Sequence, residues 1–255
     1  MSQYIDINSA DGICTVTINR PDKKNALTRD MYEAMAELIA QAKDDADKRV
    51  VVITGAGSDF CAGNDMSDFL IRDEDNYRPS AVNLLLELTD THVPIVAAIQ
   101  GRAIGIGTTL LTHCDFVYAE PDAVFSLPFI NLGVVPEAAS SQTLVLQAGY
   151  HKAAELLMLG EAFDAQTACD IGLISALSKP GEAHAMAQAT AAKLAAKPRQ
   201  ALRHTKALMR RSPEGLQERM LAEIEIFKEC LFSDSAREIM SAFVEKRAPD
   251  PNKID

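Results

Sequence analysis

Two short apolar runs, each followed by a glycine-containing turn, limit what this chain can fold into. The first is VVVI at residues 50–53, which continues into TGAG, and the second is IVAAI at residues 95–99, which continues into QGRAIGIG. A short, uninterrupted apolar run is typical of a strand buried on both faces, as the strands of a parallel sheet are. The glycines that follow permit tight turns into the next element. The chain is therefore predicted to have an α/β fold.

The segments around these runs predict further strands and helices in alternation. Residues 3–8 and 12–18 are expected to form a hairpin, because both are rich in apolar residues and a turn signal separates them. A helix is expected from Thr28, as the N-cap, to about residue 44, and a second helix near residues 79–90. The apolar stretch at residues 116–119 predicts another strand.

From about residue 139 onward the pattern becomes almost wholly helical. Asp164 is the expected N-cap of one helix, and Gly172 is expected just beyond the C-terminal end of that helix. We therefore divide the chain into a core of residues 1–197 and a C-terminal helical region of residues 198–255.

The charge balance excludes several classes of partner. With 25 Lys and Arg residues against 36 Asp and Glu, the formal net charge of the 255 residues is -11. Such an excess of negative charge argues against nonspecific binding to nucleic acid or to an anionic membrane. The five cysteines are scattered and never spaced as CxxC, so neither disulfides nor a metal site is expected. The N-terminal segment lacks the pattern of a secretory signal, and a cytoplasmic location is expected.

Two segments place backbone N–H groups where a loop turns into a helix. They are FCAGNDM at residues 60–66 and GRAIGIGTT at residues 101–109. N–H groups at the start of a helix lack partners within the helix, and together with the helix dipole they can stabilise a developing oxyanion. Each segment alone is more often an ordinary tight turn in which glycine serves only the backbone.

The order of five segments along the chain is more specific than any one of them. These segments are INRPDKKNALT, VVITGAGSDFCAGNDMSDF, PIVAAIQGRAIGIGTTL, FSLPFINLGVVPEAASS and MSAFVEKR. Together they resemble the crotonase (enoyl-CoA hydratase/isomerase) superfamily over nearly the whole chain. The resemblance implies a spiral of ββα units with a C-terminal helical trimerisation region, assembled as a homotrimer or a dimer of trimers. It also implies an acyl-CoA thioester as the ligand, with no cofactor beyond the coenzyme A that the substrate carries.

The resemblance implies that the backbone N–H groups of Asn64 and Ile106 hold the thioester oxygen. Many relatives have glycine at the second position, but the N–H group survives the change to isoleucine. Hydratases of this superfamily use two glutamates to position and activate water, and Thr109 and Phe129 stand at those positions here. Neither side chain can act as a carboxylate base, so a standard hydration is not expected.

Glu137, in the segment VPEAASS, is the remaining carboxylate in this neighbourhood. It also fits the ordinary first turn of a helix. Relatives that resemble Δ3,Δ2-enoyl-CoA isomerases have a glutamate in a PExxSS setting, paired with an oxyanion segment like AGND at residues 62–65. The resemblance therefore implies that Glu137 moves a proton from C2 to C4. Apolar neighbours are expected to raise the pKa of Glu137; these are Phe129, Ile130, Leu132 and Val134.

The resemblance also implies a set of residues that bind coenzyme A and the substrate. Lys24 and the backbone of Ala26 would lie near the phosphates and adenine, whereas Phe243 and Lys246 would reach the ligand of a neighbouring subunit. Each lysine is equally compatible with a solvated surface charge. The full set is Lys24, Ala26, Ala62, Asp65, Met66, Phe129, Phe243 and Lys246.

Two further expectations concern the surroundings of this site. Asp65 is a rival carboxylate, although capping the helix that begins at Met66 is its more ordinary role. Residues 66–90 mix charge, proline and large apolar groups, and a mobile wall of the acyl pocket is expected there.

Three functions stay open on the sequence. The first is a Δ3,Δ2-enoyl-CoA isomerase, which shifts the double bond of a 3-enoyl-CoA to the 2-position through an enolate. The second is another reaction of the superfamily on the same oxyanion site, such as hydration, hydrolysis or dehalogenation. The third is a noncatalytic protein that binds CoA thioesters, since a fold and its function are separable.

Overall fold

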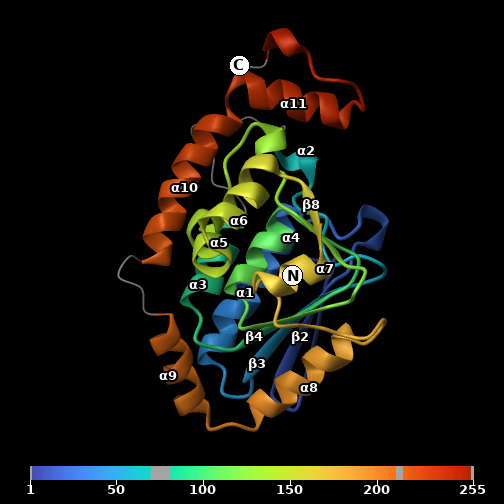
Figure 1. The fold of residues 1–255 in the computed structure, drawn as a ribbon. Helices are drawn as coiled ribbons and strands as arrows, with labels where there is room; N and C mark the ends of the chain where they lie inside the picture. Colours follow the sequence, from blue (N-terminus) through green and yellow to red (C-terminus); the bar gives the residue numbers. More distant parts are fainter. Residues whose placement is uncertain (1, 70–80, 211–214, 254–255) are drawn as a thin grey trace.

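The computed structural model describes residues 2–69, 81–210 and 215–253, and its centre is a six-stranded sheet (Figure 1). The strand order is β1-β2-β3-β4-β6-β9; β1 and β2 are antiparallel, and the later pairs are parallel. A second sheet has the order β5-β7-β8. The strands are β1 (Ile5–Ala10), β2 (Ile13–Ile18), β3 (Val50–Gly55), β4 (Ile95–Ile99), β5 (Arg102–Ile104), β6 (Phe116–Ala119), β7 (Val124–Ser126), β8 (Ala162–Asp164) and β9 (Ala176–Leu177).

Helices cover the main sheet on both faces, with α1 and α3 on one face and α8 on the other (Figure 1). The α-helices of the described residues are α1 (Arg29–Asp44), α2 (Met66–Phe69), α3 (Ala81–Asp90), α4 (Ile106–Thr109), α5 (Ser140–Ala148), α6 (Tyr150–Ala154), α7 (Ala165–Asp170), α8 (Ala183–Ala195), α9 (Arg199–Met209), α10 (Leu216–Leu231) and α11 (Asp234–Val244). Short helical turns join them: η1 (Pro21–Lys23), η2 (Leu110–His113), η3 (Ile130–Leu132), η4 (Glu155–Leu159, a π-helix) and η5 (Pro251–Lys253).

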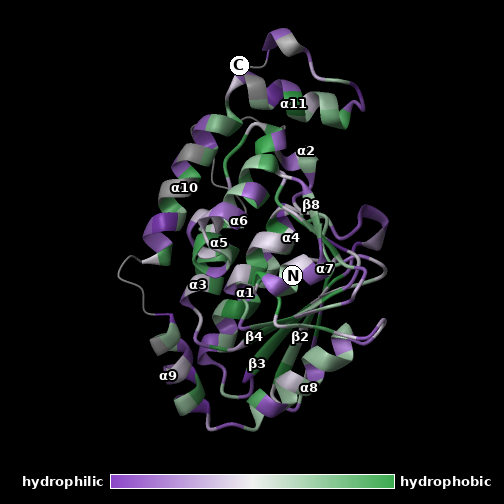
Figure 2. Ribbon diagram, viewed as in Figure 1, coloured by the Kyte–Doolittle hydropathy of each residue, from purple (hydrophilic) through white to green (hydrophobic). Residues whose placement is uncertain are grey.

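The alternation of side chains along β3 explains why its sequence is apolar throughout. Val51 and Ile53 pack in the core on the α1 side, whereas Val50 and Val52 pack with Ala187 of α8. All residues of β3 are buried, which confirms the strand predicted at residues 50–53. Figure 2 shows that the central strands β3 and β4 are hydrophobic, whereas the helices around them carry both hydrophobic and hydrophilic residues.

Most predicted elements of the core are confirmed. The two N-terminal segments form a hairpin, whose turn consists of Asp11 and Gly12 with φ of 52° and 80°. Asp164 caps α7 by accepting a hydrogen bond from the Thr167 N–H at 2.8 Å, and Gly172 follows that helix with a φ of 77°. The region after residue 139 is less helical than predicted, because β8 and β9 add short strands to the two sheets.

The mobile wall expected at residues 66–90 is wrong for its second half. Residues 81–90 form α3, and Leu84, Leu85 and Leu88 are at most 1% exposed, because this helix packs on α1 in the core. Residues 70–80 lie outside the described residues. Among the described residues of this range, Met66 lines a cavity described below.

The C-terminal region predicted from residue 198 contains α9, α10 and α11. In Figure 1, α9 lies at one end of the molecule and α11 at the other, beside the C-terminus. Arg203 ties α9 to the core by donating to the carbonyl of Lys43 at 2.7 Å. The division at residue 198 and the trimerisation role of this region stay predictions. No helix among the described residues is long and apolar enough to cross a membrane.

Candidate active site

Two loop segments that the sequence singles out lie side by side. The Cys61 N–H donates to a carbonyl of β5, and the Cys61 carbonyl accepts from the Ile104 N–H, both at 2.9 Å. On its other side the first segment pairs with Leu27, which accepts from the Asp65 N–H and donates to the Gly63 carbonyl, both at 2.8 Å. Three pieces of chain that are distant in sequence are thereby held together.

The two glycines around Ile106 permit this arrangement for different reasons. Gly105 has φ of 55° and ψ of -118°, a conformation that residues with a side chain rarely adopt. A Cβ at Gly107 would lie 2.6 Å from the carbonyl oxygen of Cys61, far inside contact distance. The first glycine therefore turns the chain into α4, and the second lets α4 pack on the Cys61 segment.

The N–H groups of Asn64 and Ile106 are the two predicted oxyanion donors. Leu27 bonds to the residues on either side of Asn64, so the Asn64 N–H points away from Leu27. Ile106 is the first residue of α4, where a helix supplies no acceptor for its own N–H. Within the part of the chain that the structure describes, neither N–H has a hydrogen-bond acceptor. The arrangement suits an oxygen that gains negative charge.

The loop before Leu27 is anchored by a buried asparagine. Asn25 donates through Nδ2 to the carbonyls of Ala56 at 2.8 Å and Asp59 at 2.6 Å. Lys24 and Asn25 have φ of 52° and 59°, in the left-handed region that asparagine adopts more readily than most residues. The Lys24 carbonyl accepts from the Ala62 N–H at 3.0 Å, so this loop borders the first segment.

A cavity of about 460 Å³ opens beside the two free N–H groups. Its volume and apolar surface suit an acyl group. The lining residues are Ala62, Gly63, Asn64, Met66, Ile104, Gly105, Ile106, Pro128, Phe129, Asn131, Leu132, Val134, Phe227, Ile239, Met240, Ala242, Phe243, Arg247 and Pro249. The predicted site residues among them are Ala62, Asn64, Met66, Ile106, Phe129 and Phe243. No Asp or Glu occurs among these described lining residues.

The helix α11 closes the cavity of its own chain. Met240 and Phe243 of α11 line the cavity together with Phe227 of α10. The loop at Gly133 packs so closely on α11 that an added Cβ would lie 3.2 Å from the Cα of Ala236. Phe243 thus lies at the cavity of its own chain, and its predicted contact with the ligand of a neighbouring subunit stays a prediction.

Glu137 lies in the turn before α5 and is 7% exposed. It is not among the cavity-lining residues. Burial and, to a lesser degree, the charge of Glu137 raise the pKa of the Cys61 thiol to about 12. The turn that carries Glu137 contacts η2, which directly follows α4, because His113 Nε2 lies 2.8 Å from the carbonyl oxygen of the next residue, Ala138.

The four apolar residues predicted around Glu137 differ in their surroundings, and their contact with Glu137 stays a prediction. Phe129, Leu132 and Val134 line the cavity. Ile130 is 51% exposed and lies against Gly160, where an added Cβ would be 3.1 Å from its Cγ2 atom. Ile130 is therefore not one of the buried apolar neighbours. The reason is local, since η3 begins at Ile130 and turns its side chain outward.

Asp65 is engaged in hydrogen bonds that suit an ionised cap. It accepts from the Ser67 N–H at 3.1 Å and from Arg20 Nη1 at 2.7 Å. Partial burial opposes ionisation, but the hydrogen bonds from Ser67 and Arg20 outweigh it and lower the pKa of Asp65. The capping role predicted at the start of α2 is confirmed. A carboxylate held ionised in this way is a weak proton acceptor.

The cationic residues predicted to bind coenzyme A lie around the cavity rather than in it. Lys24 and Lys246 are both exposed, and neither lines the cavity. The Ala26 carbonyl accepts from Arg20 Nη1 at 3.1 Å, so its backbone is tied to the same arginine as Asp65. Arg247 does line the cavity, and it forms an ion pair with Glu238.

One contributor to the site carries no signal in the sequence. The Tyr32 hydroxyl, fully buried in α1, donates a hydrogen bond to Asn64 Oδ1. Its position on the apolar face of α1, beside Met31 and Met35, is that of an ordinary core residue. The one feature of the sequence that could have indicated a role for Tyr32 is its hydroxyl group on an otherwise apolar helix face.

Comparison with known proteins places this geometry in a family. The chain matches the family model described as enoyl-CoA hydratase/isomerase over residues 8–253. It is 39% identical to rat "Enoyl-CoA delta isomerase 2" over 181 residues, which cover 68% of this chain and 46% of that relative. It is 31% identical to the Escherichia coli "2,3-dehydroadipyl-CoA hydratase" over 252 residues, with 98% of both chains covered. The chain thus spans less than half of the rat relative.

Solved structures agree with the sequence relatives. An enoyl-CoA hydratase/isomerase from Pseudoalteromonas atlantica T6c superposes with a TM-score of 0.91 at 36% identity, covering 97% of this chain and 99% of that one. The Pseudomonas aeruginosa protein OdaA gives a TM-score of 0.90 at 39% identity, with 95% and 99% covered. The predicted crotonase fold is therefore confirmed. The chain belongs to the enoyl-CoA hydratase/isomerase family, within the crotonase superfamily.

Proposed function

We propose that the protein is a Δ3,Δ2-enoyl-CoA isomerase, which moves the double bond of a 3-enoyl-CoA to the 2-position. The thioester oxygen binds to the N–H groups of Asn64 and Ile106, and Glu137 removes a proton from C2. The electron pair of that C–H bond forms a C1–C2 double bond, and negative charge passes to the thioester oxygen. Glu137 then returns the proton to C4, which restores the thioester carbonyl and leaves the double bond between C2 and C3.

The observation that carries the proposal is a pair of N–H donors that have no acceptor among the described residues, together with one buried carboxylate, Glu137. The donors of Asn64 and Ile106 belong to neighbouring segments beside an apolar cavity. Glu137 is buried, and the carbonyl oxygen of the residue after it, Ala138, lies 2.8 Å from His113 Nε2 of η2, the turn that follows α4. One carboxylate suffices for a proton transfer between two carbons, and loss of one oxyanion donor typically costs about 3 kcal/mol of transition-state stabilisation.

Hydration is the alternative that the names of some relatives suggest. Two residues at the relevant positions speak against it: Thr109 is fully buried in α4, and Phe129 is 5% exposed and lines the cavity. Neither can take a proton from water at neutral pH. The isomerase activity in the name of the rat relative needs only one base, which this chain has in Glu137.

The test is to supply a 3-enoyl-CoA and follow the absorbance of the conjugated 2-enoyl thioester. The wild type is expected to produce it, and Glu137→Gln is expected to lose the activity while still binding coenzyme A thioesters. Glu161→Gln, at an exposed position, is the matched control. A Glu137→Gln variant that isomerises at the wild-type rate would remove the assignment. Supplying the 2-enoyl thioester should give no hydrated product; rapid hydration would favour the alternative.

Binding of coenzyme A is proposed to use the rim of the cavity. Lys24 and Lys246 are exposed and free to turn toward phosphates, and the loop that carries Ala26 adjoins the Ala62 segment. Charge reversal at Lys24 or Lys246 is expected to raise KM and to leave kcat within about twofold, because a phosphate contact binds substrate and transition state alike.

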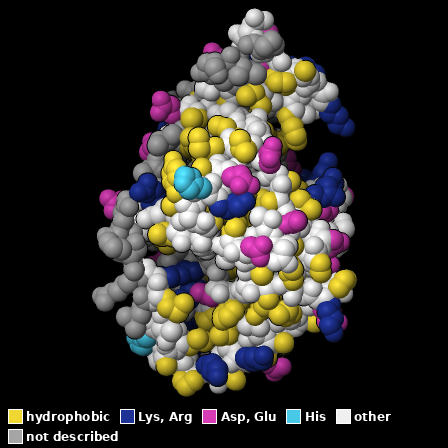
Figure 3. Space-filling model, in the orientation of Figure 1, with side chains coloured by type: hydrophobic (Ala, Val, Ile, Leu, Met, Phe, Trp, Pro, Cys, Tyr) yellow, Lys and Arg dark blue, Asp and Glu magenta, His cyan; other side chains and the backbone are white. Residues whose placement is uncertain are grey.

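Assembly as a homotrimer or a dimer of trimers is part of the same proposal. Figure 3 shows hydrophobic side chains on this face of the molecule, in the region of α5 and α6 and also in its lower half. Four large hydrophobic residues of α5, α6 and η4 are each more than half exposed, as is typical of an interaction surface: Leu146, Tyr150, Met158 and Leu159. Light scattering should give about three or six times the chain mass of 27.6 kDa. Leu146→Asp should shift it toward the monomer; a monomeric wild type would contradict the proposal.

A further inference from the structure

The turn that follows Glu137 has an unusual backbone. Ala138 and Ala139 have φ of 59° and 54°, in the left-handed region that favours glycine. Both alanines are at most 1% exposed. Two successive non-glycine residues adopt this conformation only where the surroundings hold them in it. The backbone beside Glu137 is therefore set by contacts with the rest of the fold.

A histidine makes one of these contacts. His113, at the end of η2, is 1% exposed, and its Nε2 lies 2.8 Å from the Ala138 carbonyl oxygen. A carbonyl oxygen can only accept, so the ring nitrogen is the donor. Burial and the nearby charges of Arg210 and Lys206 lower the pKa of His113 to about 4. At neutral pH the ring is consequently uncharged, with its hydrogen on Nε2.

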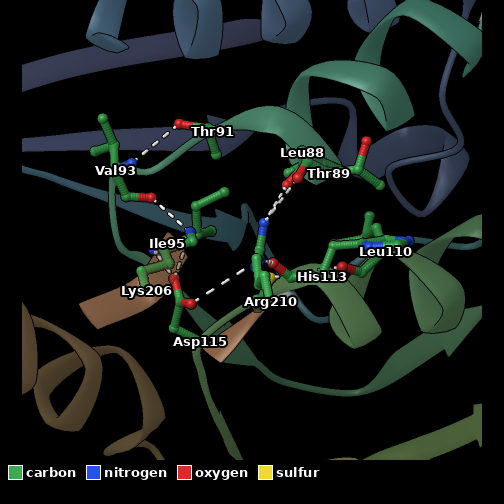
Figure 4. A network of polar contacts seen from close by, with 11 residues as sticks. Leu88, Thr89, Thr91, Val93, Ile95, Leu110, His113, Asp115, Lys206 and Arg210 are labelled. Carbon is green, nitrogen blue, oxygen red and sulfur yellow. Dashed lines mark hydrogen bonds and ion pairs between the residues drawn. The ribbon is translucent and has the colours of Figure 1, made fainter. Parts of the chain in front are cut away.

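Lys206 of α9 and Arg210, which directly follows this helix, hold the backbone around His113 (Figure 4). Arg210 donates through Nη2 to the His113 carbonyl and through Nη1 to the Leu88 carbonyl. Asp115 accepts from Lys206 Nζ at 2.7 Å and lies 3.9 Å from Arg210 Nη2. The backbone of His113 is thus fixed by contacts that do not involve the turn at Ala138.

We propose that His113 is a positioning residue for Glu137. Its Nε2–H holds the Ala138 carbonyl, and this hydrogen bond maintains the left-handed turn that sets the direction of the Glu137 carboxylate. The inference rests on the proposed function, because it takes Glu137 as the base. His113 itself touches neither the substrate nor the reacting carbons.

The test compares two substitutions that differ in the donor. His113→Leu removes it, whereas the amide of His113→Gln can donate from nearly the same place. Lys206→Met is the matched control, since Lys206 is a buried member of the same network that does not contact the turn at Ala138. Should His113→Leu fail to fold, His113→Asn takes its place, because its amide is too short to reach.

Three quantities are measured for each variant: kcat and KM with a 3-enoyl-CoA, the exchange of C2 hydrogens in D₂O, and the thermal midpoint. His113→Leu is expected to lower kcat and the exchange rate by about 10- to 100-fold with KM nearly unchanged, as a displaced catalytic group does. His113→Gln is expected to restore most of the loss. Lys206→Met is expected to lower the thermal midpoint while keeping kcat.

Wild-type kcat in His113→Leu overturns the inference, and so does an equal loss in His113→Gln or in Lys206→Met. Glu137→Gln, measured in parallel, separates this inference from the proposed function. If Glu137→Gln is inactive and His113→Leu is unimpaired, only the inference about His113 fails. If Glu137→Gln keeps the wild-type exchange rate, the proposed function fails, and any loss in His113→Leu cannot act through Glu137.

Discussion

The hydroxyl of Tyr32 donates a hydrogen bond to the side-chain oxygen of Asn64, and thereby joins α1 to the segment that carries a free N–H. Tyr32 is fully buried, so the contact comes from the interior of the protein rather than from the ligand side. The main chain at Asn64 is also paired with Leu27. The position of this donor is therefore set before any substrate binds, which is what oxyanion stabilisation requires.

Tyr32→Phe removes the hydrogen bond to Asn64 but keeps the aromatic ring in the core, so the Asn64 N–H is expected to be held less firmly. The loss of one hydrogen bond of ordinary strength, about 1 kcal/mol, corresponds to a fall in kcat of about fivefold with KM nearly unchanged. Steady-state kinetics with a 3-enoyl-CoA would measure it, with Tyr150→Phe at an exposed position as the control. An unchanged kcat with a raised KM would show that the contact serves binding instead.

Ile106→Pro tests the second donor directly. Proline is tolerated in the first turn of a helix, and Ile106 is the first residue of α4, so the substitution removes the N–H with little harm to the helix. We expect kcat to fall by about 100- to 1,000-fold. Ile106→Val keeps the N–H and should stay within about threefold of the wild type. Equal activities of the two variants would contradict the role of this N–H.

Gly107→Ala is expected to push α4 away from the Cys61 segment. The added Cβ would lie 2.6 Å from the Cys61 carbonyl oxygen, and overpacking of this kind costs about 1–3 kcal/mol of the free energy of unfolding. Activity should fall as well, because Ile106 moves with the helix. Gly215→Ala is the control, since a Cβ there meets no atom within 4 Å. Urea unfolding measures the free energy of unfolding, and steady-state kinetics measure the activity. If Gly107→Ala matches the wild type in both, the close packing is contradicted.

The stability of the protein should depend on pH through His113. Its pKa is lowered from the ordinary 6.5 to about 4 in the folded protein, first by burial and then by Arg210 and Lys206. The unfolded chain therefore binds the proton more tightly, and stability present above pH 6.5 is lost as the pH falls toward 4. The loss amounts to about 2 kcal/mol at pH 5. Urea unfolding at pH 7 and pH 5 should show a smaller drop in His113→Gln; equal drops would contradict the shift.

The elements that depend on local pattern could be predicted from the sequence. The apolar run at residues 50–53 predicts a buried strand because side chains on both faces of β3 are covered. Gly105 indicates a turn, because its backbone conformation disfavours a side chain. Gly107 indicates a close approach of two segments, because a Cβ there would clash with Cys61. The order of the motifs was enough to predict the family. It also predicted that Asn64 and Ile106 share one site, and both line the same cavity.

Features that depend on distant packing could not be predicted. No local sequence pattern predicts that α11 packs over the cavity of its own chain, with Phe243 as one of the lining residues. The turn at Ala138 and Ala139 lacks the glycine that usually marks a positive φ, because tertiary contacts hold it instead. The helix expected near residues 79–90 is confirmed as α3, but its burial against α1 could not be predicted, because that contact is tertiary.

Both proposed oxyanion donors belong to the main chain, and this has a consequence for how such a protein can change over time. Any amino acid except proline supplies an N–H, so substitution at Ile106 can reshape the cavity while the donor is inherited intact. Substrate preference can drift at such positions, whereas the electrostatic part of the chemistry is carried by the path of the backbone. What selection must preserve there is a fold rather than a residue.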